Sequence, residues 1–142
     1  MNFSANYELR KVAAGATTAT DEVVSDIIDM QGAEGVILFT TIGTDNAGNY
    51  LKAQSSDAAN MANAVDLEGK KIVATDDGQV VWLDIYKPQQ RYITANVIRT
   101  ATSATGDIYA IKYGMRTYPV DNLVTDIIIG ELLVSPEQKA IT

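Results

Sequence analysis

The chain has 142 residues, of which 46% are hydrophobic and 20% are charged, and its formal net charge is −7 at pH 7. It contains neither cysteine nor histidine, which excludes disulfides, thiolate metal sites, cysteine nucleophiles and Ser-His-Asp triads. The excess of acidic residues argues against binding to nucleic acid, because proteins that bind the phosphate backbone concentrate Lys and Arg on one surface.

This length and composition are typical of one globular domain that buries its own core. The chain has no uninterrupted run of 18 apolar residues, so we expect no membrane-spanning helix. Residues 1–6 lack the basic start and the apolar run of a signal peptide. We therefore expect synthesis in a cytoplasm.

The first 20 residues are predicted to form an N-terminal arm or a first strand. Phe3, Tyr7 and Leu9 are spaced by polar residues, a pattern that suits an edge strand and a docking arm equally well. Two weak strands are expected near residues 7–13 and 23–30. The small, polar run 15–20 between them predicts a mobile loop.

Three antiparallel hairpins are predicted from alternating, β-branched segments separated by turn residues. The strongest turn signal is the Asp77-Gly78 step, because glycine tolerates the positive φ of a tight turn. The three hairpins would pair residues 35–43 with 50–54, residues 71–74 with 79–86, and residues 91–99 with 107–116.

The side-chain pattern assigns faces to these strands. Residues 35–43 are apolar on both faces, which predicts a central strand. The residues expected to face the core are Leu51, Ala53, Val81, Leu83, Ile85, Ile93, Ala95, Val97, Tyr109, Ile111, Tyr113 and Met115. Trp82, Asp84 and Tyr86 are expected on the opposite face of their strand, half exposed or covered by a neighbour.

Residues 55–64 are rich in alanine and predict a short helical turn with Ser56 or Asp57 as its N-cap. No long amphipathic helix separates the strands, which disfavours a parallel α/β fold. About eight antiparallel strands predict an all-β sandwich, with the jelly roll as a natural member of that class. The sandwich is expected over residues 21–119.

Residues 120–142 are predicted to form a C-terminal arm or the last strand. The part up to residue 136 is rich in Ile, Leu and Val but alternates poorly, so both faces of an extended form would be apolar. Burying one Ile or Leu side chain contributes about 1.5–3 kcal/mol, and leaving six of them in water would cost on the order of 10 kcal/mol. Either the sandwich itself or a second chain must cover them.

From these considerations, eleven residues are expected to contact another protein subunit. They are Phe3, Tyr7, Leu9, Trp82, Tyr118, Leu123, Ile127, Ile128, Ile129, Leu132 and Leu133.

The motifs of enzymes and metal sites are missing from the sequence. It has no phosphate-binding glycine loop and no G-x-S-x-G motif, and the Asp-rich run at residues 45–49 does not have the spacing of a calcium loop. The carboxylates Asp45, Asp57, Asp66, Asp76 and Asp77 are explained by turn chemistry. We predict no catalytic activity, no metal and no cofactor. Trp82, Tyr86, Tyr92 and Tyr118 are the candidates for an aromatic platform that binds sugars.

Three segments carry a resemblance to a known family. Residues 28–36, the strand end Gln54-Ser55-Ser56-Asp57, and residues 84–88 followed by Arg91-Tyr92 resemble the small proteins of tailed bacteriophages that coat or cement the capsid exterior. The likeness extends over residues 22–119. It implies a β-sandwich or jelly-roll module, often trimeric, that clamps adjacent major capsid subunits through extended termini.

We therefore expect a structural virion protein that binds the outer surface of a phage capsid and stabilises it by bridging major capsid subunits. A homo-oligomer is expected, with the trimer favoured, and the protein would be made in the host cytoplasm and act on the virion exterior. The alternative is a receptor- or glycan-binding module on a phage head or tail. A hydrolase that uses loop carboxylates is the least favoured hypothesis.

Overall fold

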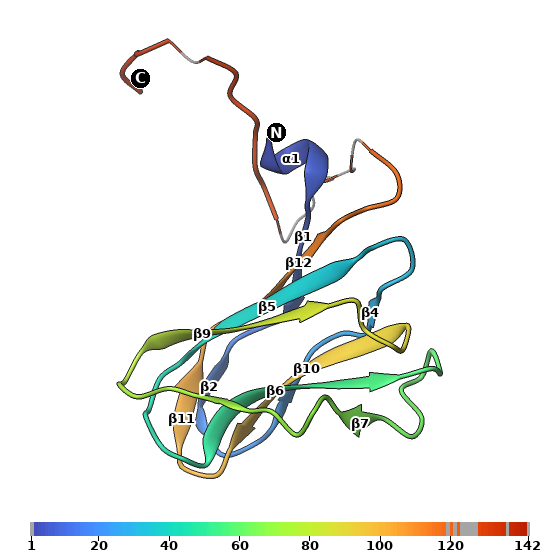
Figure 1. Cartoon of the computed structure of the whole chain (residues 1–142). Coiled ribbons are helices and arrows are strands. Elements are labelled where there is room, and N and C mark those ends of the chain that lie inside the picture. The colour runs from blue at the N-terminus through green and yellow to red at the C-terminus, as the bar shows by residue number, and fades with distance from the viewer. Residues whose placement is uncertain (1, 119, 121, 123–127, 136, 142) are drawn as a thin grey trace.

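Two antiparallel sheets face each other in the computed structural model, which describes residues 2–118, 120, 122, 128–135 and 137–141 (Figure 1). Sheet A contains β1 (Glu8–Ala13), β2 (Ala16–Ala19), β5 (Gly35–Ile42), β9 (Gln79–Tyr86), β11 (Ser103–Thr105) and β12 (Ile108–Tyr113). Sheet B contains β3 (Val23–Val24), β4 (Ile28–Asp29), β6 (Asn49–Ser56), β7 (Val65–Asp66), β8 (Ile72–Val73) and β10 (Tyr92–Arg99).

The described helix, α1 (Phe3–Asn6), precedes β1 and is capped by the Asn2 side chain, which accepts a hydrogen bond from the Ala5 amide. It has four residues. In the described part of the chain, no helix is long and apolar enough to cross a membrane.

The strand order is that of a jelly roll. β11 and β12 both pair with β5, β3 and β4 both pair with β10, and β7 and β8 both pair with β6, while β1 and β2 flank β12 and β11. When each such pair is counted as one interrupted strand, the order is 1-8-3-6 in sheet A and 2-7-4-5 in sheet B. This eight-stranded, two-sheet order confirms the predicted antiparallel β-sandwich of jelly-roll type.

All three predicted hairpins are wrong as pairings, although their strands exist. β5, β9 and β12 lie in sheet A, whereas β6, β8 and β10 lie in sheet B. Each predicted hairpin turn is therefore part of a crossover between the sheets. Gly78 does adopt a positive φ of 75°, because a tight turn between sheets needs the same backbone conformation as a hairpin.

Three smaller expectations are also corrected. Residues 16–19 form β2, which pairs with β11, instead of a mobile loop. The segment predicted near 23–30 is split into β3 and β4, because the Ser25 hydroxyl accepts the hydrogen bond of the Ala95 amide in place of a backbone carbonyl. Residues 57–64 form turns without a helix, and Ser56 Oγ accepts from the Ala58 amide and donates to the Ala62 carbonyl.

The core lies between the sheets and follows the period-two alternation of the long strands. β5 is the central strand of sheet A, as predicted, with β9 on one side and β11 and β12 on the other. The fully buried apolar side chains with 0% exposure are Val36, Leu38, Ile42, Leu51, Ile93, Ala95, Val97 and Ile108. Leu51, Ala53, Val81, Ile93, Ala95 and Val97 face the core as the sequence predicts.

One face assignment is wrong. On β12, Ile108 and Ala110 are the buried residues, so the alternating residues Tyr109, Ile111 and Tyr113 point to the opposite, outer face of sheet A. Met115 lies beyond the end of β12. The expectation that these four residues face the core is thereby corrected.

Arg99 is a buried cation that ties three segments together. Its side chain is 4% exposed. Nε donates to the Asp21 carbonyl at 2.6 Å, and Nη1 donates to the carbonyls of Thr17 and Ser103 at 2.8 and 2.6 Å. Because carbonyl oxygens that are buried without a donor destabilise a fold, this one side chain holds the end of β10 to β2 and to β11.

We predict that Arg99→Met lowers the free energy of unfolding by about 2–4 kcal/mol, because three carbonyls lose a charge-assisted donor. Urea unfolding followed by circular dichroism measures the change. Arg116→Met, at an exposed position, is the matched control and should change stability by less than about 0.5 kcal/mol. Equal effects of the two substitutions would contradict the role given to Arg99.

Candidate functional site

The outer face of sheet A carries a row of aromatic side chains on three neighbouring strands. Trp82 of β9 lies opposite Phe39 of β5, and Phe39 lies opposite Tyr109 of β12. The rings of Phe39 and Tyr109 stack with their centroids 5.3 Å apart, and Trp82 is 61% exposed. The core-facing residues of these strands are the alternate ones, so the row points away from the sandwich interior.

A second, mostly aliphatic row continues the same face. Leu9 of β1 lies opposite Ile111, Ile111 lies opposite Ile37, and Ile37 lies opposite Asp84. The three aliphatic side chains are half-buried. Together with the aromatic row they make an apolar surface across four strands, which we call the sheet A face.

Tyr113 and Tyr86 border this face. The Tyr113 ring covers Gly35, where an added Cβ would lie 2.3 Å from the ring, so a larger residue at position 35 would have to displace this ring. Tyr113 donates to the Asp84 carboxylate at 2.5 Å, and burial together with this carboxylate raises the pKa of Tyr113. Tyr86 donates to Glu34 at 2.8 Å. The Tyr113 phenol is therefore a protonated donor near neutral pH.

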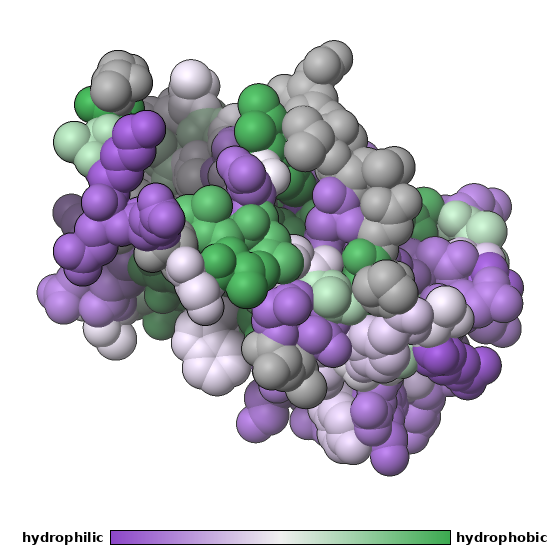
Figure 2. Space-filling model, turned by 90° about the horizontal axis from the view of Figure 1, so that it is seen from above, coloured by the Kyte–Doolittle hydropathy of each residue, from purple (hydrophilic) through white to green (hydrophobic). Residues whose placement is uncertain are grey.

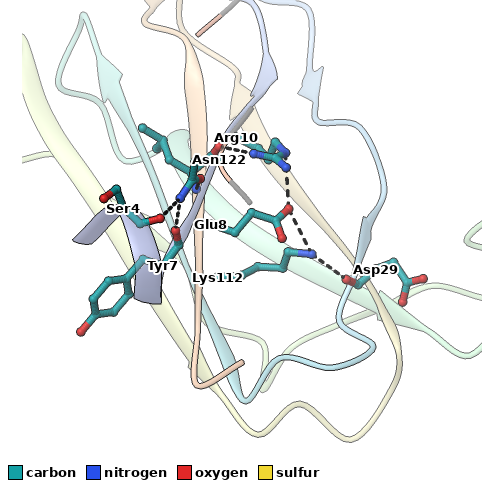
Figure 3. A network of polar contacts seen from close by, with 8 residues as sticks. Ser4, Tyr7, Glu8, Arg10, Asp29, Lys112 and Asn122 are labelled. Carbon is teal, nitrogen blue, oxygen red and sulfur yellow. Dashed lines mark hydrogen bonds and ion pairs between the residues drawn. The ribbon is translucent and has the colours of Figure 1, made fainter. Parts of the chain in front are cut away.

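Asn122 joins the segment after β12 to the N-terminus (Figure 3). Its Nδ2 donates to the carbonyls of Ser4 and Tyr7, at 2.9 and 2.5 Å, and its Oδ1 accepts from the Leu9 amide at 3.0 Å. The Val120 amide adds a bond to the Ala5 carbonyl. These contacts bring residues 120 and 122 beside α1 and the start of β1, at the end of the sandwich where the termini lie (Figure 1).

An apolar hollow of about 380 Å³ lies beside Asn122. Its apolar lining residues are Phe3, Leu9, Ile128, Ile129 and Leu132. The Phe3 ring also stacks on Tyr7, with 5.2 Å between centroids. Figure 2 looks onto this end of the molecule and shows a hydrophobic area flanked by hydrophilic residues. We call this group of residues the terminal cluster.

The structure thus gathers five of the eleven expected contact residues into the terminal cluster. Tyr7 stacks against it, and Leu133 follows it in the chain with 66% exposure. Trp82 lies on the sheet A face, and Tyr118 is exposed beyond β12. Leu123 and Ile127 lie outside the described residues. Residues 129–135 pair with no described strand.

Sequence reasoning missed the centre of the sheet A face. Phe39 was part of a segment apolar on both sides, and Tyr109 and Ile111 were expected to point inward. The signal for their exposure lies in the partner strand, because Tyr109 can be placed only when its register with Phe39 is known.

A network of charged side chains lies where β1, β12 and β4 meet (Figure 3). The Glu8 carboxylate lies 3.3 Å from Arg10 Nε and 3.4 Å from Lys112 Nζ, and Lys112 donates to the Asp29 carbonyl at 3.3 Å. Arg91 binds the Asp29 carboxylate with two bonds of 2.8 Å. The bond from Arg91 is the main cause that lowers the pKa of Asp29 to about 2.

The three segments that carry the family resemblance meet at one end of the sandwich. Asp29 pairs with Arg91, the Lys87 amide donates to the Glu34 carbonyl, and Ser55 donates to Gln90. Residues 30–34, 87–91, 114 and 116 line an open cleft of about 670 Å³ at this end. Segments far apart in the sequence therefore form one loop cluster.

The other sequence candidates are dispersed. Trp82 and Tyr86 share the outer face of β9, but Tyr92 is on β10 of sheet B and Tyr118 follows β12, so the four residues do not form one aromatic platform. Asp66 binds Lys52 and Gln54. A hydrogen bond and repulsion from Asp77 raise the pKa of Asp45. Among the described residues, no group of three or more His, Cys, Asp or Glu could hold a metal ion.

Comparison with known proteins identifies no family. No protein-family model and no curated protein matches the chain. Among solved structures, one similar chain is the endo-1,4-beta-D-xylanase 10B of Clostridium thermocellum, solved as its CBM22-1–GH10 modules with xylohexaose. The identity is 13% and the TM-score 0.44, over 84% of this chain and 29% of that chain. The class of the protein, a jelly-roll β-sandwich, rests on its own two sheets.

We predict that Asn122→Ala speeds hydrogen exchange at the Leu9 amide, which loses its acceptor, while the amide of buried Leu38 is unaffected. Exchange measured by NMR tests this. Asn60→Ala is the matched control, since the Asn60 side chain accepts only within its own turn, from the Ala62 amide. Unchanged protection at Leu9 would show that Asn122 does not hold the two segments together.

The Asp29–Arg91 pair gives a pH-dependent prediction. The pKa of Asp29 lies near 2, below its ordinary value of 3.8, so its contribution to stability is complete above about pH 4 and is lost as the pH falls through 2. Both side chains are nearly half exposed, so Asp29→Asn should cost less than about 1 kcal/mol at pH 7. The difference in urea midpoint between the native protein and Asp29→Asn should narrow as the pH falls below 4. A difference that stays unchanged down to pH 2 would contradict the ion pair.

Proposed function

We propose that this chain is a structural protein that binds the exterior of a phage capsid and stabilises it by bridging major capsid subunits. The observation that supports protein binding is the sheet A face, where Trp82, Phe39 and Tyr109 stand side by side on three strands. Contiguous exposed apolar patches mark interaction sites, and Trp, Tyr and Phe are enriched at the centres of protein interfaces.

Bridging requires more than one contact surface, and the molecule has two. Leu9 belongs to both of them, because it lies opposite Ile111 on the sheet A face and lines the hollow of the terminal cluster. The two surfaces therefore adjoin around one edge of sheet A. A molecule that carries an apolar sheet face and an apolar end can contact two neighbouring subunits at once. Many copies on a symmetric shell then gain by multivalency.

We propose the phage capsid as the partner because three segments resemble capsid cement proteins. The fold brings these segments together in one loop cluster through the contacts Asp29–Arg91 and Ser55–Gln90. Segments that resemble a family over separate stretches of sequence and then meet in space are consistent with one shared structural unit. The chain's lack of cysteine also suits a protein outside the cell, because it has no thiol to oxidise.

The test is the double variant Phe39→Thr/Ile111→Thr, which removes apolar area from the sheet A face while keeping β-branched side chains in the strands. We expect at least a tenfold loss of affinity, or about 1.4 kcal/mol, in co-sedimentation with capsid shells that lack the protein. Shells loaded with the variant should also lose the protection against heat that the native protein gives.

Val24→Thr/Val65→Thr is the matched control, because both valines are exposed but lie on sheet B. It should bind capsids as the native protein does. Native affinity of the sheet A double variant would refute the role of this face, and failure of the native protein to bind any phage shell would refute the capsid as partner.

A glycan-binding module remains the second candidate because Trp82 and Tyr86 are both exposed on the outer face of β9, and aromatic faces stack on flat groups. Retention of the native protein on immobilised polysaccharides, lost in Trp82→Ala but kept in Phe3→Ala, would favour this function. Absence of retention together with capsid binding would reject it.

A further inference from the structure

β9 is an open edge of sheet A. All eight of its residues pair with β5, and within the described residues no strand pairs with its other side. Unpaired backbone N–H and C=O groups on a long edge strand are a template for pairing with another chain. The backbone N–H and C=O groups on the side of β9 that faces away from β5 are therefore available to a further strand.

The phase of the ladder identifies the free groups. The Lys87 amide donates to the Glu34 carbonyl at 2.8 Å, which makes this pair a hydrogen-bonded one. Antiparallel pairs alternate between hydrogen-bonded and non-hydrogen-bonded, so the register assigns residues 79, 81, 83 and 85 to the bonds with β5. The N–H and C=O groups of residues 80, 82, 84 and 86 consequently point away from β5.

A groove runs along this free edge. It has a volume of about 460 Å³ and is lined by Ile72 and Val73 of β8 and by residues 79–84 of β9. Val80 and Trp82 are 63% and 61% exposed. The groove thus offers backbone partners on one wall and apolar side chains around them, which is what an added β-strand requires.

Residues 128–135 match this groove in length and chemistry. The segment has eight residues, as β9 has, and reads Ile-Ile-Gly-Glu-Leu-Leu-Val-Ser. Its residues 129–135 pair with no described strand, and Ile129 and Val134 are 83% and 77% exposed. Burial of such side chains against another chain favours association.

The tether of this segment favours a different molecule as the recipient. Asn122 fixes the chain beside Leu9 of β1, and β1 and β9 lie on opposite sides of sheet A, separated by β12 and β5. Ile128, Ile129 and Leu132 line the hollow beside Leu9, and the described chain after them runs away from its own sandwich (Figure 1). A second copy can present its segment to β9 without crossing the sheet A face.

We propose that the open edge of β9 accepts residues 128–135 of a second copy of this chain as an added strand. Donor and acceptor are different surfaces, so the contact is head-to-tail and can close into a ring. This self-association needs no capsid and therefore goes beyond the proposed function.

The test uses two full-length variants. Ile129→Asp/Leu133→Asp disables the donor segment at exposed positions. Val80→Pro disables the acceptor edge, because it removes an N–H that points away from β5, a position where proline is tolerated. In analytical ultracentrifugation the native chain should be oligomeric and each variant monomeric. An equimolar mixture of the two variants should form a 1:1 dimer, since one keeps the edge and the other keeps the segment.

Trp82 is the only tryptophan in the chain and provides a readout that does not depend on the proline variant. Insertion of a strand beside it should shift its emission to the blue as the native protein is concentrated, and the donor variant should show no such shift. Ala140→Asp/Ile141→Asp adds the same charge outside the segment and should behave as the native chain does.

The proposal is overturned if the native chain stays monomeric at its highest soluble concentration, if the donor variant remains oligomeric, or if the mixture fails to associate. The native chain could also be monomeric while the Trp82 emission of the donor variant lies further to the red than that of the native chain. This result would place the segment on its own β9 and would also refute exchange between copies. Capsid binding by the monomeric Val80→Pro variant tests the proposed function separately, because every residue of the sheet A face and of the terminal cluster is unchanged in it.

Discussion

Burial of the inward side chains of β5 in the core between the two sheets is the contact on which the rest of the fold depends. Val36, Leu38 and Ile42 are fully buried, and β5 carries neighbours on both of its sides. Because a strand alternates, a β5 that buries these residues must present Ile37 and Phe39 on the other side. The sandwich does not need those outer side chains for its own core. Their apolar character is the basis of the proposal that this face contacts another protein.

Two polar side chains satisfy backbone groups that the apolar core does not. Arg99 and Asn122 both work by satisfying backbone groups, Arg99 within the sandwich and Asn122 where the terminal segments meet. Neither depends on a titrating partner, since one is a guanidinium bound to carbonyls and the other is an amide. The Asp29–Arg91 pair in the loop cluster is a pH-sensitive contact, and so are the Asp66–Lys52 and Asp107–Lys11 pairs, because the pKa of each of these carboxyl groups is lowered.

The sequence is sufficient to locate the strands but not to pair them. Asp77-Gly78 marks a real turn, yet the same local signal serves a hairpin and a crossover between sheets, and here it precedes a change of sheet. On β12 the larger apolar residues, Tyr109, Ile111 and Tyr113, point outward, while Ile108 and Ala110 are buried. When the outer face of a strand is also apolar, hydrophobicity alone does not show which of its two faces points to the core. The alternation of β9 predicts Trp82 on the face opposite the core, half exposed or covered by a neighbour, but β5 is apolar on both faces and allows no such prediction for Phe39.

The joining of residues 120 and 122 to α1 has a practical consequence for display. Both ends of the sandwich domain leave from one pole, and the loops around Thr44, Asp77 and Ala101 lie at the opposite pole, where β5 ends and β6 and β9 begin. Exposed loop tips tolerate insertions. A foreign epitope grafted into residues 45–47 would be carried on the far side from any domain fused to either terminus. One molecule could then present two cargoes that do not collide.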